Sequence, residues 1–235
     1  MIRVLSYNVL IGSRLKKIVT WLAEQQSHHD IYCFQEFPQS QIQTVCDVFS
    51  SVAPKDYLFS HAFTKKDKTF GQLTLFDTRN VRLEHSSIVS LGKTPLIEKK
   101  LLSNQGERSA LVSNFWSHEG SFTLVNTHLT LMTTNKRRQS QLLTILDSIK
   151  KLYQDAKAKI ILGDFNYTSL YRRRHLFQLM KEHGFENAYK KSTHRVLFLK
   201  HQVDYAFYHN CSIRNVEVEK VRFSDHYPIT FEVHL

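Results

Sequence analysis

The stretch KIILGDFN, residues 159–166, joins an apolar run to a glycine and to the polar residues Asp164 and Asn166. The run Lys159–Leu162 has the length and composition of a buried strand, and the glycine marks its end. Apolar residues at helical spacing between 142 and 149 precede it, and a second helix is predicted over Leu170–Glu182. A buried strand between two helices indicates a sheet flanked by helices.

Outward from this stretch, the N-terminal part of the chain alternates strands with helices, and most of the remaining predicted elements are strands. Near the N-terminus a strand over Ile2–Tyr7 precedes a helix over Ser13–Gln25, and a strand over Asp30–Phe34 precedes a helix over Gln41–Phe49. Further strands are predicted at Tyr57–Ala62, Gly71–Phe76, Val81–Val89, Ser109–Trp116, Ser121–Asn126, Val203–Tyr208, Ile213–Val218 and Ile229–His234. This order favours an α/β fold of two packed mixed sheets with helices outside over a purely parallel doubly wound sheet.

Composition indicates a single domain over residues 1–235, because four prolines and seven glycines form no linker and no repeat is present. No stretch has the composition of a transmembrane helix, and the apolar run Ile2–Tyr7 is too short for a signal-peptide core. Cys33, Cys46 and Cys211 form no CxxC pair, and their odd number argues against a disulfide-stapled secreted protein. We therefore expect a cytoplasmic location.

The chain is strongly basic. Its 32 Lys and Arg residues outnumber its 21 Asp and Glu residues, which gives a formal net charge of +11. Such a surplus favours a polyanionic partner, either nucleic acid or an anionic membrane surface. The alternative is a basic surface that serves solubility alone.

Polar residues recur at the carboxyl ends of the predicted apolar strands. A single polar residue there is ordinarily just the start of a loop, but six such places made almost wholly of Asn, Glu, Asp and His indicate strand ends that meet at one cleft. The six places are Asn8, Gln35–Glu36, Asn126–His128, Gly163–Asn166, Asp204 and Ser224–His226.

These residue types suit one class of reaction. Carboxylate and carboxamide oxygens bind hard cations such as Mg²⁺, and histidines hydrogen-bond phosphate oxygens or move protons. The sequence lacks the GxSxG context of a serine hydrolase, the phosphate loop GxxxxGK[ST] and the zinc motif HExxH. Metal-assisted hydrolysis of a phosphoester is the chemistry that remains.

The motifs SYN, FQE, NTHL, GDFN, VDY and SDHYPI follow one another from Ser6 to Ile229. In this order and approximate spacing they resemble the endonuclease/exonuclease/phosphatase superfamily over nearly the whole chain. The resemblance implies a four-layer α/β sandwich, two mixed sheets flanked by helices, and an Mg²⁺- or Mn²⁺-dependent phosphoesterase.

The resemblance also implies a role for each residue that matches a motif. Glu36 would be the principal metal ligand, Asn8 would support the metal or the phosphate, and Asp225 would either help to bind metal or hold its loop. Asp164 would orient or deprotonate the attacking water, with Asn166 beside it on the phosphate. One or two metal ions both remain open.

Three further residues would act on the phosphate. His128 resembles the family histidine that donates to a phosphoryl oxygen, and His226 would contact the scissile phosphate. Asp204 would fix the tautomer of His226 and favour its protonated form, because a carboxylate partner raises the pKa of a histidine. A protonated histidine stabilises the charge of the transition state.

The substrate is less constrained. The residues VLIGS after Asn8 and FPQ after Glu36 differ from the usual abasic-site endonuclease pattern, which demotes that activity. Basic and aromatic residues that follow NTHL and GDFN could track a nucleic-acid backbone and stack on unpaired bases, although helix-start cations are often only solvated. These residues are Lys136, Arg137, Arg138, Tyr167, Tyr171, Arg172, Arg173 and Arg174. A third cluster, Lys65, Lys66 and Lys68, has no catalytic motif beside it.

We therefore predict a monomeric phosphodiesterase that acts as a nuclease on DNA or RNA. A sphingomyelinase-like or phosphoinositide phosphoesterase, with anionic phospholipid as its partner, is the main rival. A catalytically inactive binding protein of the same fold is the other, although Glu36, Asp164, Asn166 and His226 are all present. Endo or exo action and strand polarity stay open.

Overall fold

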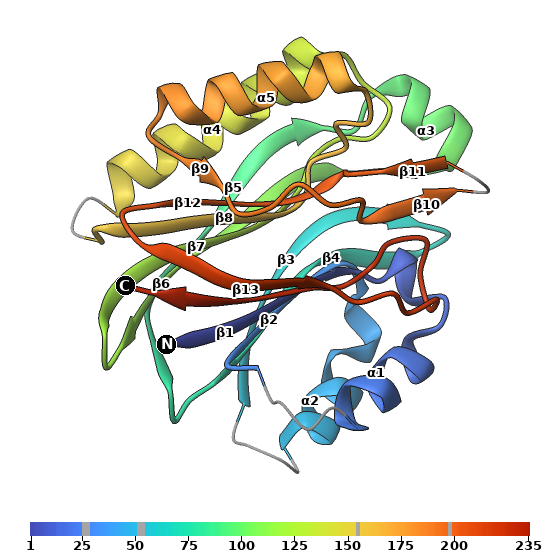
Figure 1. Cartoon of the computed structure of the whole chain (residues 1–235). Helices are drawn as coiled ribbons and strands as arrows, with labels where there is room; N and C mark the ends of the chain where they lie inside the picture. Colours follow the sequence, from blue (N-terminus) through green and yellow to red (C-terminus); the bar gives the residue numbers. More distant parts are fainter. Residues whose placement is uncertain (25–28, 51–54, 154–155, 197–198) are drawn as a thin grey trace.

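The computed structural model describes residues 1–24, 29–50, 55–153, 156–196 and 199–235. Two six-stranded sheets lie face to face, and helices cover their outer sides (Figure 1). The first sheet has the order β13-β14-β1-β2-β4-β3, and the second has the order β5-β6-β7-β8-β12-β9. This is the predicted α/β architecture of two mixed sheets flanked by helices.

The first sheet contains both ends of the described chain. Its strands are β1 (Ile2–Asn8), β2 (Ile31–Pro38), β3 (Lys55–Lys65), β4 (Lys68–Asp77), β13 (Ser212–Val218) and β14 (Ile229–His234). Helices α1 (Leu15–Glu24) and α2 (Ile42–Ser50) cover its outer face (Figure 1), and the short turns η1 (Leu10–Gly12) and η2 (Gln39–Gln41) follow β1 and β2.

The second sheet is built mainly from the middle of the chain. Its strands are β5 (Val81–Lys93), β6 (Glu107–Ser117), β7 (Gly120–His128), β8 (Ala158–Asp164), β12 (Asp204–His209) and β9 (Glu186–Asn187). Helices α4 (Asn135–Leu152) and α5 (Leu170–Glu182) cover its outer face, and α3 (Leu96–Leu102) connects β5 to β6. A small hairpin, β10 (His194–Val196) with β11 (Leu199–His201), stands apart from both sheets.

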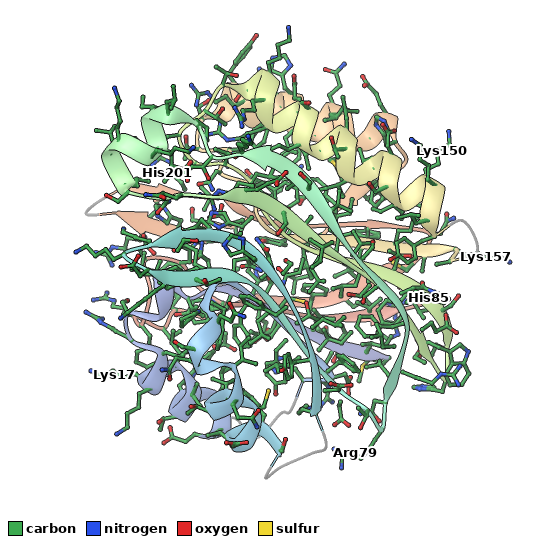
Figure 2. The ribbon with its side chains drawn as sticks, turned by 180° about the vertical axis from the view of Figure 1, so that it is seen from behind. Lys17, Arg79, His85, Lys150, Lys157 and His201 are labelled. Carbon is green, nitrogen blue, oxygen red and sulfur yellow. The ribbon has the colours of Figure 1, made fainter. Side chains whose placement is uncertain are left out.

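Apolar side chains form three main buried layers. One lies under α1 and α2, one under α4 and α5, and the third fills the space between the two sheets. Seen from behind with its side chains, the same interior is densely occupied (Figure 2). Burial of this surface is the main favourable contribution to folding, and it fixes the relative position of the sheets.

The predicted helices and strands are confirmed, with shifted ends. Helix α1 begins at Leu15 rather than Ser13, and Gln25 lies outside the described residues. Strand β2 continues past Phe34 to Pro38. The described residues contain no helix that is both long and apolar enough to span a membrane.

Helix α3 was not predicted. It exposes Leu96, Ile97 and Leu101, whereas Glu98 on its inner side is fully buried. This inverts the usual pattern of an amphipathic helix, so apolar periodicity could not reveal it.

Candidate active site

Parallel strand pairing brings four polar strand ends together. β1 pairs with β2 in parallel, with Asn8 opposite Gln35, and β7 pairs with β8 in parallel, with His128 opposite Asp164. Carboxyl ends of parallel neighbours meet at one edge of a sheet. A hydrogen bond of 3.1 Å from Asn8 Nδ2 to Asp164 Oδ2 joins the two sheets at this edge.

Asp204 and His226 reach the same edge from strands that run the opposite way. β12 is antiparallel to β8 and places Asp204 directly opposite Asp164. His226 precedes β14, which is antiparallel to β1. These residues therefore come just before or at the start of their strands rather than at a carboxyl end, and antiparallel pairing supplies the convergence.

Glu36 sits at an irregularity in β2. The pairing of β2 with β4 shifts register between Phe34 and Phe37, and Glu36 has a φ of 56°. A bulge re-aims the side chain that it carries, and a left-handed conformation outside glycine is a strained one of the kind found at functional sites. Without the bulge, strand alternation alone would set the direction of this carboxylate.

The loop after β8 is equally constrained. Gly163 has a φ of +128°, and a Cβ atom there would lie 2.0 Å from the carbonyl oxygen of Thr127 on β7. Asp164 Oδ1 accepts a 2.9 Å hydrogen bond from the backbone N–H of Asn166, whose side chain donates to the carbonyl of Leu129 at 2.9 Å. The GDFN loop therefore turns back on itself and holds Asp164 in place.

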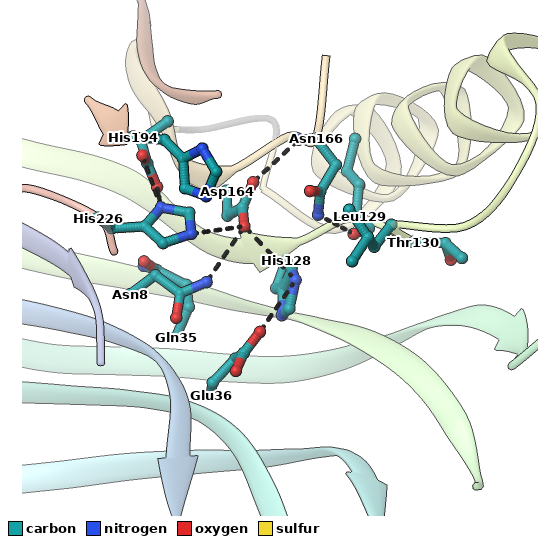
Figure 3. A network of polar contacts seen from close by, with 12 residues as sticks. Asn8, Gln35, Glu36, His128, Leu129, Thr130, Asp164, Asn166, His194 and His226 are labelled. Carbon is teal, nitrogen blue, oxygen red and sulfur yellow. Dashed lines mark hydrogen bonds and ion pairs between the residues drawn. The ribbon is translucent and has the colours of Figure 1, made fainter. Parts of the chain in front are cut away.

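Asp164 is the centre of the contacts (Figure 3). Besides the bond from Asn8, its Oδ2 lies 3.6 Å from His128 Nε2 and 3.8 Å from His226 Nε2. Both separations exceed an ordinary hydrogen bond, so the two imidazoles still have hydrogen-bonding capacity at this point. Burial raises the pKa of Asp164, although His226 opposes the rise.

His226 is held by a carboxylate on its other side. Its Nδ1 lies 2.9 Å from Asp204 Oδ2, and both side chains are buried. Burial alone would lower the pKa of His226, but the carboxylates of Asp204, Asp164 and Asp225 outweigh it and raise the pKa to about 10. The ring is therefore a cation at neutral pH.

His128 is held in the opposite charge state. Burial, Arg108 and His226 together bring its pKa well below the usual value, so the ring is neutral. Arg108 Nη1 lies 3.4 Å from His128 Nδ1, and a guanidinium only donates. Nδ1 therefore accepts, and the ring proton lies on Nε2, which faces Asp164 and, at 3.8 Å, Glu36 Oε1.

Comparison with known proteins shows the family to which the chain belongs. The model of the endonuclease/exonuclease/phosphatase family matches residues 5–226. The chain belongs to this family. Members of this family are hydrolases that act on phosphoester bonds. No curated protein matches the chain.

Solved structures of family proteins share the fold. A mannosyl-6-phosphatase of Bacteroides thetaiotaomicron superposes with a TM-score of 0.76 at 17% identity, with 100% of both chains covered. The human Nocturnin catalytic domain with a bound sulfate anion gives 0.74 at 21% identity, covering 99% of this chain and 94% of that one. A humanised D. rerio TDP2 gives 0.72 at 18% identity, with 98% of both chains covered. These identities establish a shared fold, not a shared substrate.

The structure adds a residue that the sequence motifs did not indicate and shows a link between two strands that carry motif residues. His194, on β10, lies 3.4 Å from Asp225 Oδ2 through its Nε2, and its ring centroid is 4.6 Å from that of His226. Gln35 donates to Asn126 Oδ1 at 2.8 Å, which links β2 to β7 behind the site. Only the tertiary pairing brings His194 here, because no motif surrounds it in the sequence.

Arg108 and Glu98 form a buried ion pair beneath His128. Glu98 accepts hydrogen bonds from Arg108 and, at 3.1 Å, from Asn104 Nδ2. The guanidinium also lies over the ring of Phe63, 4.7 Å from its centroid. Helix α3, which the sequence did not reveal, therefore supports a histidine of the site through Arg108.

Acidic and histidine groups in the site could hold a metal ion. Among the described residues, two clusters have ligand atoms within 4.8 Å of one another: Asp164, Asp204 and His226, and also His194, Asp225 and His226. Both include His226, and a protonated imidazole cannot ligate a cation. The Glu36 carboxylate fits a hard cation better than these clusters do, because hard cations prefer oxygen ligands. Burial raises the pKa of Glu36, which means that its negative charge is unfavourable in the buried site. A bound cation would compensate that charge.

The basic and aromatic residues of the sequence prediction divide into exposed and buried members. Arg138 is buried, donates to the carbonyl oxygens of Thr130 and Leu131, and packs over the buried ring of Tyr167. In this structure neither side chain is available on the surface to a phosphate or a base, contrary to the expectation for both. Arg138 contacts protein carbonyl oxygens and the ring of Tyr167, so we infer that the two side chains stabilise the loop after β7.

The other members of the two clusters lie at the surface. Lys136, Arg172 and Arg174 are exposed, Tyr171 is 70% exposed, and Arg173 is half-buried. Arg137 is half-buried and donates to the carbonyl oxygen of Lys93.

Proposed function

We propose that this chain is a divalent-metal-dependent phosphodiesterase that cleaves DNA or RNA. One observation carries the proposal. A carboxylate (Asp164), a protonated imidazole (His226), a neutral imidazole with its proton on Nε2 (His128) and a carboxamide (Asn8) converge on one point, with Glu36 beside them. This set supplies a base, a cation and neutral donors around the place of a phosphoryl group.

Glu36 is the residue that would hold Mg²⁺ or Mn²⁺, with Asn8 and Asp225 as its neighbours. Asp225 lies close enough to raise the pKa of Glu36. A bound divalent cation would polarise the phosphoryl oxygen and neutralise its developing charge.

Asp164 orients the attacking water and takes its proton. Because burial raises the pKa of Asp164, this carboxylate is a stronger base than an exposed aspartate. The water oxygen forms a bond to phosphorus as the bond to the leaving oxygen breaks. The Asn166 backbone N–H fixes the other oxygen of Asp164. The Asn166 carboxamide would bind the phosphate from beside it.

Two histidines of different charge contact the phosphoryl oxygens. His226, a cation oriented by Asp204, stabilises the negative charge of the transition state through Nε2. His128 donates a neutral hydrogen bond through Nε2, a tautomer that Arg108 imposes. A cation and a neutral donor on different non-bridging oxygens stabilise the pentacovalent arrangement.

A nucleic-acid substrate follows from charge and placement. The net charge of +11 favours a polyanion, and Lys136, Arg137, Arg172, Arg173 and Arg174 lie at the surface beyond two strand ends of the site. Tyr171 is exposed beside this basic cluster, where an unpaired base could stack.

A panel of phosphodiesters tests the proposal. Purified protein is incubated with single- and double-stranded DNA, RNA, sphingomyelin and phosphoinositides, with and without Mg²⁺ or Mn²⁺. We expect metal-dependent cleavage of a nucleic acid that Asp164→Asn abolishes. The matched control is Asp147→Asn, an exposed carboxylate on α4, which should retain activity. Absence of cleavage on the whole panel would favour the inactive binding protein instead.

A phospholipid substrate is the second candidate, and one observation favours it. Helix α3 exposes Leu96 (74%), Ile97 and Leu101 next to the exposed Lys100, and its Glu98 is linked to His128 through Arg108. Apolar side chains beside cations suit the surface of an anionic bilayer. Cleavage of the lipids alone on the same panel would select this candidate.

A further inference from the structure

A cavity of about 890 Å³ is lined by segments that follow two strands of the candidate active site. Two parts of its lining lie close in sequence to site residues: Ile11 and Gly12, in η1, come shortly after Asn8, and Pro38, at the end of β2, comes shortly after Glu36. The tip of the β3–β4 hairpin contributes Lys65, Lys66, Lys68 and Phe70 to the lining. The cavity and the catalytic centre are therefore built on the ends of the same strands.

Cationic side chains dominate the rim of this cavity. None of the lining residues is acidic, and none of its five lysines forms an ion pair within the described part of the chain. Although the exposed Asp67 stands between Lys66 and Lys68, cations without ion-pair partners in such number raise the local concentration of anions. The cations are Arg14, Lys16, Lys17, Lys65, Lys66 and Lys68.

The lining also has an apolar part. Ile11, Pro38 and Phe70 contribute to it, and Gly12 packs so closely that a Cβ atom there would lie 2.7 Å from Pro38 Cγ. A free phosphate or a lipid headgroup needs only the cations. A nucleotide uses both parts, because its phosphate meets the cations and its base covers the apolar surface.

A second cavity is lined by residues of this region and of the loop that carries His226. Its volume is about 510 Å³, it shares Ser13 and Arg14 with the first cavity, and it reaches Asp225, the neighbour of His226. Arg14 donates to the carbonyl oxygen of Arg222 at 2.8 Å, which fixes the guanidinium where the two cavities meet. A path lined by cations therefore leads from the loop of His226 to the hairpin lysines.

We propose that the larger cavity is a second anion-binding subsite, which binds the unpaired nucleotides flanking the scissile phosphodiester of a single-stranded nucleic acid. This inference rests on the proposed nuclease function and specifies the side on which the strand lies. The strand crosses the loops of the first sheet, over Arg14 and the hairpin lysines, rather than following only the basic residues of α4 and α5.

The test compares two triple variants that remove the same charge. The hairpin variant is Lys65→Gln/Lys66→Gln/Lys68→Gln, and the control is Lys150→Gln/Lys151→Gln/Lys157→Gln. Lys17, on the rim, lies on the opposite side of the molecule from Lys150 and Lys157 (Figure 2). Binding of a fluorescent single-stranded oligonucleotide is measured by anisotropy over a range of salt concentrations, without divalent metal.

We expect the hairpin variant to bind about tenfold more weakly, with the slope of log affinity against log salt reduced by about two, as the loss of three phosphate contacts on a single strand requires. The control should lose less than about threefold, the effect of net charge alone. Lys16→Gln/Lys17→Gln, at two other residues of the lining, should weaken binding in the same direction. Equal losses in the hairpin variant and the control, or none in the hairpin variant, would overturn the subsite.

Further measurements distinguish this subsite from a direct effect of the lysines on catalysis, from failure of the nuclease function and from a lipid-binding surface. Hydrolysis of bis(p-nitrophenyl) phosphate, too small to reach the cavity, should be unchanged in the hairpin variant; a loss there would mean that the lysines act on the catalytic centre, against the proposal. The wild-type protein could cleave no substrate while the hairpin variant still binds the oligonucleotide more weakly than the control. That result would contradict the nuclease function and support the oligonucleotide-binding site. Loss of binding to phosphatidylserine vesicles with oligonucleotide binding retained would overturn the subsite in favour of a lipid surface.

Discussion

At the scale of single residues, unusual backbone conformations accompany the chemistry. Glu36 and Asn166 both have φ values near 56°, and Gly163 has a φ of +128°. Such conformations are costly unless the surrounding structure imposes them, and here strand pairing and the GDFN loop do so. Each of these residues either belongs to the candidate site or holds a member of it.

Gly163 allows a direct test of this reasoning. Gly163→Ala would place a methyl group 2.0 Å from the Thr127 carbonyl, whereas at Gly120, with a similar φ of +131°, nothing lies within 4 Å. Both substitutions strain the backbone, so the difference between them isolates the steric clash. We expect Gly163→Ala to lower the free energy of unfolding by about 2 kcal/mol more than Gly120→Ala, measured by urea denaturation. Equal losses would show that β7 and β8 relax around the methyl group.

The pair of Asp204 and His226 predicts the pH dependence of activity. In the proposed mechanism the protonated ring of His226 is the active form. Because the ring stays protonated up to its pKa of about 10, activity should fall on the alkaline side near that value. In Asp204→Asn the largest contribution that raises this pKa is gone while burial still lowers it. The alkaline limb of kcat/KM should therefore move to lower pH, toward or below the ordinary histidine value of about 6.5. Asp147→Asn serves as the control, and an unmoved limb in Asp204→Asn would contradict the assignment.

At the scale of elements, the two ends of the strands in the first sheet carry different groups of polar residues. One end carries Asn8 and Glu36, and the other carries a charge cluster at the start of β3 and the end of β4. There the buried Asp77 contacts Lys55 at 3.3 Å and the Arg79 side chain at 2.8 Å. This cluster lies at the opposite ends of the strands from the catalytic centre, so its effect should be on stability alone.

The same cluster predicts how stability depends on pH. Burial alone would raise the pKa of Asp77, but Arg79 and Lys55 outweigh it and lower the pKa to about 2. Since this value lies below the unfolded value of about 3.9, the cluster stabilises the fold above pH 4 by about 2 kcal/mol. That contribution is lost as pH falls through the folded pKa.

Asp77→Asn should therefore reduce the free energy of unfolding by about 2 kcal/mol at neutral pH and by progressively less toward pH 2. Chemical denaturation at a series of pH values measures this, with Asp147→Asn as the control. A deficit that is the same at every pH would mean that packing, not charge, accounts for it.

At the scale of the whole molecule, the site exists only where the two sheets meet. Asn8 and Glu36 come from the first sheet, His128 and Asp164 from the second, and His226 from the loop before β14. A cation held by Glu36 at this junction would bind the folded protein and not the unfolded chain, so it should stabilise the whole fold.

Thermal unfolding with and without Mg²⁺ measures this linkage independently of activity. A free ion concentration about a hundredfold above its Kd adds about 2.7 kcal/mol to the free energy of unfolding. We expect a rise in Tm for wild type that is largely absent in Glu36→Gln and present in Asp147→Asn. A rise of equal size in Glu36→Gln would place the ion elsewhere.

Much of this molecule was predictable from local sequence. Helix α5 and strand β14 have the predicted bounds, and the motif residues from Asn8 to His226 do lie together at one edge of the sheets. Helices and strands follow from periodicities of a few residues, and polar residues at strand ends stand out against apolar runs. Helix α3 was not predicted because it buries Glu98 and exposes apolar residues, which is the reverse of the periodicity on which the prediction of helices depends.

The sequence by itself determined the α/β architecture and the principal candidate residues of the site, because both are carried by short-range patterns and ordered motifs. Only the tertiary structure decided which cations face solvent: Arg138 is buried against Tyr167, whereas Lys65, Lys66 and Lys68 join Arg14 and Lys17 on one cavity. Only the tertiary structure added His194 and Arg108 to the site. The physical reason is that neighbours across a sheet depend on strand order and register, which pair residues far apart in the chain and leave no local signature.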